Sequence, residues 1–109
     1  MNFLILARDR PGCEAIRDRL RPQRLEWLRA NQHRLLAAGG QVDDRNRHVH
    51  GGLMIVEANS RAEAQAFADE DPFTPAGLYE TVEVVRWRKV FFDFRRVTSP
   101  DPFQPDPQP

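Results

Sequence analysis

The chain lacks net charge, because its 16 Lys and Arg residues are balanced by 16 Asp and Glu residues. Nucleic-acid-binding domains normally carry a strong excess of basic residues, and anionic membranes attract basic segments. We therefore expect neither nucleic acid nor a membrane as a partner of this protein.

Cysteine is almost missing as well. The single Cys13 excludes a disulfide within the chain and is typical of proteins in a reducing cytosol. There is also no long apolar run near the N-terminus: the stretch from Phe3 to Ala7 is far too short for a signal peptide or a membrane span, and Arg8 follows it at once. These absences together predict a cytoplasmic protein.

What the chain does contain fits one globular domain. Its 109 residues are 40% hydrophobic, which is enough for a single core and too little for two. We expect residues 1–96 to form this domain. Residues 97–109 hold five prolines and are predicted to be an extended or disordered Pro-rich tail.

Hydrophobic periodicity predicts four strands and two helical regions in the order β, α, β, β, α, β. Proline at position 22 is expected to divide the first helical region into two segments, since it lacks the N–H group that a helix interior needs. Gly39-Gly40 is expected to end that region. The predicted elements are a strand over 2–7, helical segments from 13 to Gly39-Gly40, strands over 41–46 and 51–58, a helix over 61–70 and a strand over 80–92.

This order in so short a chain predicts a ferredoxin-like α+β sandwich, in which two helices cover one face of a four-stranded antiparallel sheet. The strands over 3–7 and 53–58 are nevertheless apolar on both faces. Two helices can cover only one of these faces. We therefore expect a homodimer in which a second copy covers the other face of the sheet.

Three consecutive carboxylates, Asp69-Glu70-Asp71, stand at the end of the second predicted helix. Ser60 followed by Glu63 is a capping-box pattern that starts this helix, and Pro72 biases Asp71 out of it. The negative end of the helix dipole and the mutual repulsion of the carboxylates both disfavour their ionised form. One of the three is therefore expected to have a raised pKa, which a general acid or base near neutral pH needs. Asp71 is the candidate catalytic residue. Alternatively, it only caps a short turn that begins at Pro72.

Several short segments along residues 1–92 form a recognisable series in their order and spacing. They are the N-terminal strand, Arg21-Pro22 before Leu25-x-x-Leu28, Ala38-Gly39, Gly52-Leu53-Met54-Ile55-Val56-Glu57, Ala68-Asp69-Glu70-Asp71-Pro72-Phe73, Ala76-Gly77-Leu78 and Trp87-Arg88-Lys89-Val90-Phe91. With these segments the chain resembles the YciI-like (YCII-related) family. This resemblance implies a dimeric ferredoxin-like fold of the α/β-barrel type, a small cleft between the long helix and the sheet, and a presumed active site built from a His and an Asp.

The family's Asp falls on Asp71 and its His falls on Arg24, because this chain has Arg21-Pro22-Gln23-Arg24 where the family usually has Arg-Pro-x-His. A guanidinium cannot serve as a base near neutral pH, whereas an imidazole can. We assign ligand binding in the expected cleft to Arg24, Arg21, Gly52 and Phe73.

Two functions follow from this departure. In the first, the protein is a small lyase or isomerase, similar to dehydrochlorinases or muconolactone isomerases, in which Asp71 moves a proton and Arg24 holds a small anionic carboxylate substrate. In the second, it is a non-catalytic binding or structural dimer with a vestigial site. Both predict that Arg24 contacts Asp71, since a carboxylate at the negative end of a helix needs a cation to remain ionised.

We predict no metal and no cofactor. His48 and His50 point to the same face if they lie on a strand, but no third and fourth ligands match them, so they are weak evidence for a metal site. Tyr79 and Trp27 are assigned to core packing or to the dimer interface.

Overall fold

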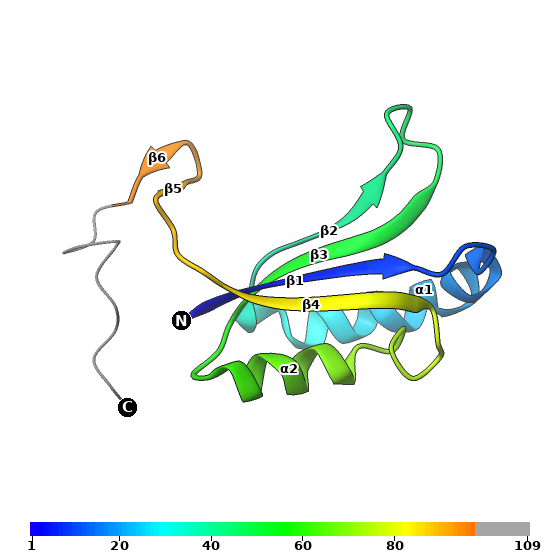
Figure 1. Ribbon diagram of the computed structural model, residues 1–109, viewed down its shortest axis with the longest axis horizontal. Coiled ribbons are helices and arrows are strands. Elements are labelled where there is room, and N and C mark those ends of the chain that lie inside the picture. Colours follow the sequence, from blue (N-terminus) through cyan, green and yellow to red (C-terminus); the bar gives the residue numbers. More distant parts are fainter. Residues whose placement is uncertain (98–109) are drawn as a thin grey trace.

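The computed structural model describes residues 1–97, and the predicted Pro-rich tail therefore lies outside the described residues except for Val97. Figure 1 shows one sheet with both long helices against the same face. The elements are β1 (Asn2–Asp9), α1 (Glu14–Ala30), a short 3₁₀ helix η1 (Gln32–Arg34), β2 (Leu35–Val42), β3 (Val49–Glu57), α2 (Arg61–Glu70), β4 (Tyr79–Trp87), β5 (Phe91–Phe92) and β6 (Arg95–Arg96).

The main sheet has four antiparallel strands in the order β2-β3-β1-β4. Its two central strands, β1 and β3, are the ones with apolar residues on both faces. The outer positions belong to β2 and β4, which follow α1 and α2 in the chain. The predicted ferredoxin-like α+β fold is therefore confirmed.

The core lies between the sheet and the helices. Alternate residues of β1, among them Phe3 and Ile5, are 2% exposed, and Met54 and Val56 continue this layer on β3. From α2, Phe67 packs against the same layer, and its ring centroid lies 4.7 Å from that of Trp27 on α1. Both helices thus bury their apolar side on one face of the sheet.

The opposite side of the sheet, which we call the open face, carries the other alternate residues. Leu4 and Leu6 of β1 lie opposite Ile55 and Leu53 of β3, and all four are only partly buried. On β4, Val85 lies opposite Leu4 and is 44% exposed. The chain's described elements leave this apolar surface uncovered.

Helix α1 is continuous through Pro22, so the predicted division into two segments is wrong. A proline in a helix interior costs about 3 kcal/mol, because one hydrogen bond is lost. Tertiary contacts on both sides of the proline hold the helix together: Arg17 precedes it, and Trp27 and Leu28 pack against the core after it. The helix ends at Ala30, where the Asn31 side chain donates a 2.8 Å hydrogen bond to the carbonyl oxygen of Trp27.

The predicted role of Gly39-Gly40 as a helix end is also wrong, because both glycines lie within β2. The register puts Gly40 opposite Gly52 and Gly39 opposite Leu53 of β3. Pairing with β3 therefore overrides the local tendency of a Gly-Gly pair to stop a helix. The predicted strand over 41–46 is correspondingly six residues too late at its start, since β2 begins at Leu35.

Helix α2 has the predicted bounds, Arg61–Glu70. The Ser60 hydroxyl oxygen accepts a 3.1 Å hydrogen bond from the backbone N–H of Glu63, which satisfies one free donor at the helix start. The Glu63 carboxylate does not return to Ser60 in the full capping-box manner; it lies 3.7 Å from the guanidinium of Arg34.

The last strand is shorter than predicted, since β4 ends at Trp87 and not at Phe92. Its partner β1 begins at Asn2, which lies opposite Trp87, so β4 has no neighbour to pair with beyond that point. The chain continues into a small hairpin, β5–β6, that stands off the end of the sheet (Figure 1). No helix within residues 1–97 is long and apolar enough to cross a membrane.

Candidate functional site

A cleft of about 300 Å³ opens between α1 and the edge of the sheet formed by β2 and β3. Its lining contains three guanidinium groups and an apolar floor, and no carboxylate belongs to it. The lining residues are Arg17, Arg21, Arg24, Leu25, Leu28, Ala38, Gly39, Gly40, Val49 and Phe73.

The three arginines reach the same cleft because of their spacing. Positions three and four residues apart lie on one face of a helix, so Arg17, Arg21 and Arg24 form a stripe along α1 that Leu28 extends. Arg17 is buried, Arg24 is partly buried and Arg21 is exposed. The stripe therefore runs from the interior to the solvent.

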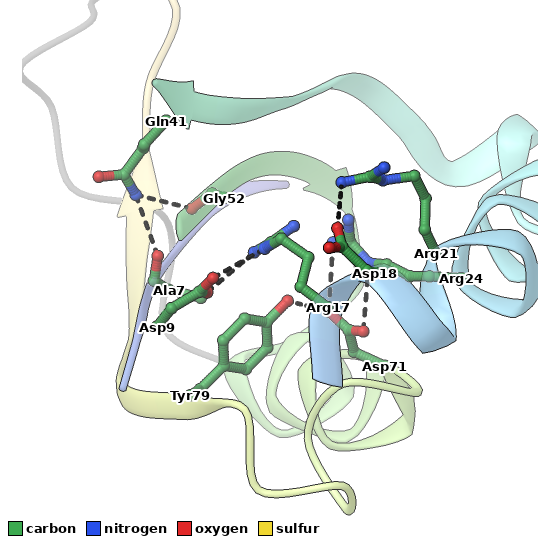
Figure 2. A network of polar contacts seen from close by, with 10 residues as sticks. All are labelled: Ala7, Asp9, Arg17, Asp18, Arg21, Arg24, Gln41, Gly52, Asp71 and Tyr79. Carbon is green, nitrogen blue, oxygen red and sulfur yellow. Dashed lines mark hydrogen bonds and ion pairs between the residues drawn. The ribbon is translucent and has the colours of Figure 1, made fainter. Parts of the chain in front are cut away.

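Arg24 and Asp71 form a buried ion pair, as predicted (Figure 2). Nε of Arg24 lies 3.2 Å from Oδ1 of Asp71, and Nη2 lies 3.2 Å from Oδ2. This two-point arrangement matches the planar fork of a guanidinium to a carboxylate. The exposed fractions of the two side chains are 12% and 2%, so water takes little part in the contact.

Every hydrogen-bonding position of the Asp71 carboxylate is occupied. Oδ1 also accepts a 3.0 Å hydrogen bond from the backbone N–H of Phe73, and Oδ2 accepts a 2.8 Å hydrogen bond from the Tyr79 hydroxyl. Four donors therefore satisfy the two oxygens, which have about four lone-pair sites. Asp71 stands at the C-terminal cap of α2 and also organises the turn after it, since its carbonyl oxygen accepts from the backbone N–H of Thr74. The carboxylate holds Arg24 in place and has no free lone pair for a substrate proton.

Tyr79 lies at the back of this pair. Burial raises the pKa of its hydroxyl, and the neighbouring Asp71 raises it further against the opposing effect of Arg24. Tyr79 is therefore a neutral phenol at physiological pH, and it acts as a hydrogen-bond donor to Asp71.

A second buried ion pair lies beside the first. Nε and Nη2 of Arg17 lie 2.7 and 2.8 Å from the carboxylate oxygens of Asp9, and both side chains are 9% exposed. Burial by itself lowers the pKa of the Arg17 guanidinium, but the hydrogen bond and the charge of Asp9 raise the pKa more, so the net pKa lies above its ordinary value. A register shift between Arg8 and Asp9 puts Asp9 opposite Tyr79 at the end of the sheet.

Phe73 connects the two ion pairs. The guanidinium carbons of Arg17 and Arg24 lie 4.8 and 5.0 Å from the centroid of its ring. Such cation–π contacts are attractive, more so when the groups are desolvated. The ring is 1% exposed and meets Tyr79 edge to face, with centroids 6.0 Å apart. One aromatic ring thus fixes the positions of both buried guanidinium groups.

Glycine makes room for Arg24 under α1. A Cβ atom at Gly52 would lie 4.0 Å from Nη2 of Arg24, so a side chain longer than alanine would displace the guanidinium. Gly40 lies directly opposite Gly52 on β2, and a Cβ atom there would meet Cγ1 of Val49 at 3.0 Å. The two opposed glycines therefore leave space beneath the arginine stripe that larger side chains would occupy.

The structure brings four of the five predicted site residues into contact with one another or with the cleft: Arg21, Arg24 and Phe73 line the cleft, and Asp71 holds Arg24. Gly52 does not line the cleft but lies under Arg24. Sequence reasoning missed the pair of Asp9 and Arg17 and assigned Tyr79 to packing. The helical spacing of Arg17 from Arg21 and Arg24 could have indicated that Arg17 lies in the same cleft. Nothing in the local sequence indicated that Tyr79 would reach Asp71.

His48 lies in the turn between β2 and β3, and His50 is the second residue of β3. His48 borders a small cavity of about 180 Å³ that Arg17 and Arg21 also line, and His50 borders a separate one of about 410 Å³ with Asp9 and Glu80. Within residues 1–97, no three side chains of the metal-binding types gather closely enough to hold an ion. The prediction that the protein has no metal stays a prediction.

The chain is similar in sequence to known proteins. Residues 1–88 match the YCII-related domain family. The protein YciI of Escherichia coli O6:H1 is 37% identical over 98 residues, which cover 84% of this chain and all of that protein. An uncharacterized protein of Haemophilus influenzae is 34% identical with the same coverage.

Among solved structures, the chain is similar to 5-chloro-2-hydroxyhydroquinone dehydrochlorinase (TftG) from Burkholderia phenoliruptrix AC1100, in complex with 2,5-dihydroxybenzoquinone. The TM-score is 0.73 at 33% sequence identity, over 81% of this chain and 94% of the other.

Proposed function

The chain belongs to the YCII-related domain family, and from this premise we propose that its cleft binds a small, flat, anionic molecule such as a carboxylate or an ionised hydroxyquinone. The observation that carries this proposal is the lining: three arginines and an apolar floor without any carboxylate. A volume of about 300 Å³ suits a single ring with its substituents.

The free donors of the stripe support binding of an anion. Arg24 uses Nε and Nη2 for Asp71, and Arg17 uses the same atoms for Asp9, so Nη1 of each remains for a ligand. Their buried carboxylates fix the guanidinium groups in advance, and preorganised donors bind a ligand at a lower entropic cost. Arg21 at the mouth contributes an exposed charge, and its ion-pair partner among residues 1–97 is the similarly exposed Asp18.

The similar protein TftG supports the ligand class. It was solved with 2,5-dihydroxybenzoquinone, a flat ring whose hydroxyl groups are acidic because they are conjugated to the carbonyls. An anion of this kind offers oxygen atoms to the arginines and two faces to the apolar floor.

The experiment is a calorimetric titration with benzoate, with 2,5-dihydroxybenzoquinone and, as a matched neutral ligand, with benzamide. Binding of the two anions but not of benzamide is the expected result. Arg21→Gln should weaken benzoate binding by about threefold to tenfold, since charge-assisted contacts at an open site contribute about 0.5–1.5 kcal/mol. Arg19→Gln is the control, because Arg19 lies on the opposite side of α1. Equal affinity for benzoate and benzamide, or none for any of the three, contradicts the proposal.

The second candidate is a lyase or isomerase in which Asp71 moves a proton, and the dehydrochlorinase activity of TftG favours it. The saturated hydrogen bonding of Asp71 opposes it, because Arg24 or Tyr79 must first release the carboxylate. A chloride-release assay with chlorinated hydroquinones tests this candidate. We expect no turnover by the protein, and a gain of activity in Arg24→His if an imidazole is the missing acid–base group. Turnover by the unmodified chain that is lost in Asp71→Asn would instead favour catalysis.

We also propose that the open face pairs with a second copy of the chain. Leu4, Leu6, Leu53 and Ile55 form an apolar centre that no described element covers. Sedimentation velocity at micromolar concentration should give a dimer, and Leu53→Arg should convert it to a monomer. A monodisperse monomer of the unmodified chain would contradict this proposal.

A further inference from the structure

The β5–β6 hairpin exposes three phenylalanine rings within four residues. Phe91 is 65% exposed, Phe92 37% and Phe94 103%. The match to the family model ends at residue 88, so this hairpin lies beyond the matched residues. Its rings contribute nothing to the core between the sheet and the helices.

The turn of the hairpin is strained in order to present a ring. Asp93 and Phe94 have φ angles of 54° and 64°, in the left-handed region that glycine and asparagine adopt at low cost. A bulky residue such as phenylalanine pays about 1–3 kcal/mol there. An unfavourable residue at the most exposed point of a turn indicates selection for a contact and not for the turn itself.

The segment is also strongly basic. Residues 86–97 contain five Lys and Arg residues and one acidic residue, Asp93. Because the chain as a whole is neutral, the remainder is acidic by the same amount. Two of the cations cover ring faces within the hairpin: Lys89 lies 5.4 Å from the centroid of Phe92, and Arg96 lies 5.7 Å from that of Phe91. The tip ring of Phe94 has no such cover among the described residues.

We propose that this hairpin is a dimerisation arm that packs on a second copy of the chain, next to the open face. This inference rests on the proposed dimer, and it adds the element that completes the interface. β4 supplies Val85 to the open face and then leads directly into the hairpin, so the two apolar surfaces are continuous along the chain.

Charge complementarity favours a second copy over an anionic polymer. Glu57 and Glu83 lie on the open face, opposite Asn2 and Leu6 of β1, and within residues 1–97 neither carboxylate has an ion-pair partner. They offer negative charge at the rim of the surface on which a basic hairpin would dock.

The area required by a stable dimer points the same way. Four strands of about eight residues present a flat face of roughly 500 Å², with strands about 4.8 Å apart and about 3.3 Å per residue. A standard interface needs about 800 Å² from each partner. Three phenylalanine rings with the exposures given above add on the order of 300–400 Å². The sheet face alone is too small, and the sheet face with the hairpin is sufficient.

The test is the dimer dissociation constant by sedimentation for the unmodified chain, Phe94→Gly and Phe94→Leu. Glycine suits the left-handed turn better than phenylalanine, so Phe94→Gly keeps the hairpin while it removes the ring. We expect Phe94→Gly to weaken the dimer by about tenfold or more, and the matched control Phe94→Leu to retain most of the affinity. Circular dichroism and thermal unfolding at a concentration where both variants are dimeric establish that the fold is intact.

The outcomes separate this proposal from the proposed dimer. A dimer that is disrupted by Leu53→Arg but unchanged by Phe94→Gly supports the open face and overturns the arm. A monomeric chain at all concentrations overturns both. Binding of that monomer to vesicles that contain phosphatidylserine, lost in Phe94→Gly, would overturn the arm in favour of a lipid surface.

Discussion

Three Arg–Asp ion pairs involve the arginines of the cleft; two of these pairs are buried and one is exposed. Arg24 with Asp71 and Arg17 with Asp9 have exposed fractions of at most 12%. The pair of Arg21 with Asp18 has exposed fractions of 60% and 68% and an N–O distance of 3.1 Å. The distances hardly differ between the two settings, so distance alone does not distinguish the function of these pairs.

The difference lies in what surrounds each pair. A buried charge has lost its water, and its partner together with further donors must replace that water. Asp71 has these donors in Tyr79 and the backbone N–H of Phe73. An exposed pair keeps its water whether or not the contact forms, so it contributes about 0–1 kcal/mol. The buried pairs can therefore hold a guanidinium in one position, as the proposed binding site requires.

Removing one member of a buried pair should have the largest effect. Arg24→Leu leaves the Asp71 carboxylate buried without its cation and should lower the free energy of unfolding by about 3–5 kcal/mol. Urea denaturation measures this loss. The double variant Arg24→Leu with Asp71→Leu should recover much of it, since no uncompensated charge remains. A single-variant loss below about 1 kcal/mol would show that the buried and exposed pairs are equivalent.

The hydrogen bond of Tyr79 should come next. Tyr79→Phe removes the hydroxyl donor from a buried carboxylate and should cost about 1.5–3 kcal/mol in the same assay, the range for hydrogen bonds to charged groups. Tyr79→Phe keeps the ring, so its contact with Phe73 is preserved and the loss reports on the hydroxyl. No change in stability would mean that Asp71 needs only Arg24.

The same tyrosine predicts a pH dependence. Burial and Asp71 raise the pKa of Tyr79 above the value of about 10 for an unfolded tyrosine. Below about pH 10 the Tyr79 hydroxyl makes its full contribution to the free energy of unfolding. Above that pH the unfolded chain releases the phenolic proton while the folded protein retains it, so the free energy of unfolding falls as the pH rises. Tyr79 is the only tyrosine, so phenolate absorbance follows it directly. Tyr79→Phe should have a shallower decline, and ionisation of the folded protein near pH 10 would contradict the assignment.

The exposed pairs should give the smallest effects. Arg21→Gln and Arg47→Gln each remove the cation from a contact within one turn of chain, with Asp18 and Asp43 respectively. We expect each substitution to change the free energy of unfolding by less than about 1 kcal/mol. This difference should disappear at high salt, because salt screens exposed charges. A loss comparable to that of Arg24→Leu would remove the distinction between the two settings.

Sequence reasoning predicted the parts of the fold in which local and tertiary preferences agree. Helix α2 has a cap at Ser60, a regular apolar face and a proline just after its end, and its predicted bounds match those observed. The prediction for the first helical region was wrong where local and tertiary preferences conflict. Pro22 and Gly39-Gly40 are strong local signals, but packing of α1 and pairing of β2 with β3 overrode both.

The sequence by itself determined the fold class, the family and the contact of Arg24 with Asp71, because hydrophobic period, a cap and family motifs are properties of neighbouring residues. Only the tertiary structure decided that Asp9 and Tyr79 join the site and that Asp71 has no free lone pair. Tyr79 and Asp71 meet across a turn, and Asp9 meets Arg17 between a strand and a helix. Such contacts depend on how elements pack, and the identity of a residue says nothing about which buried partner will satisfy it.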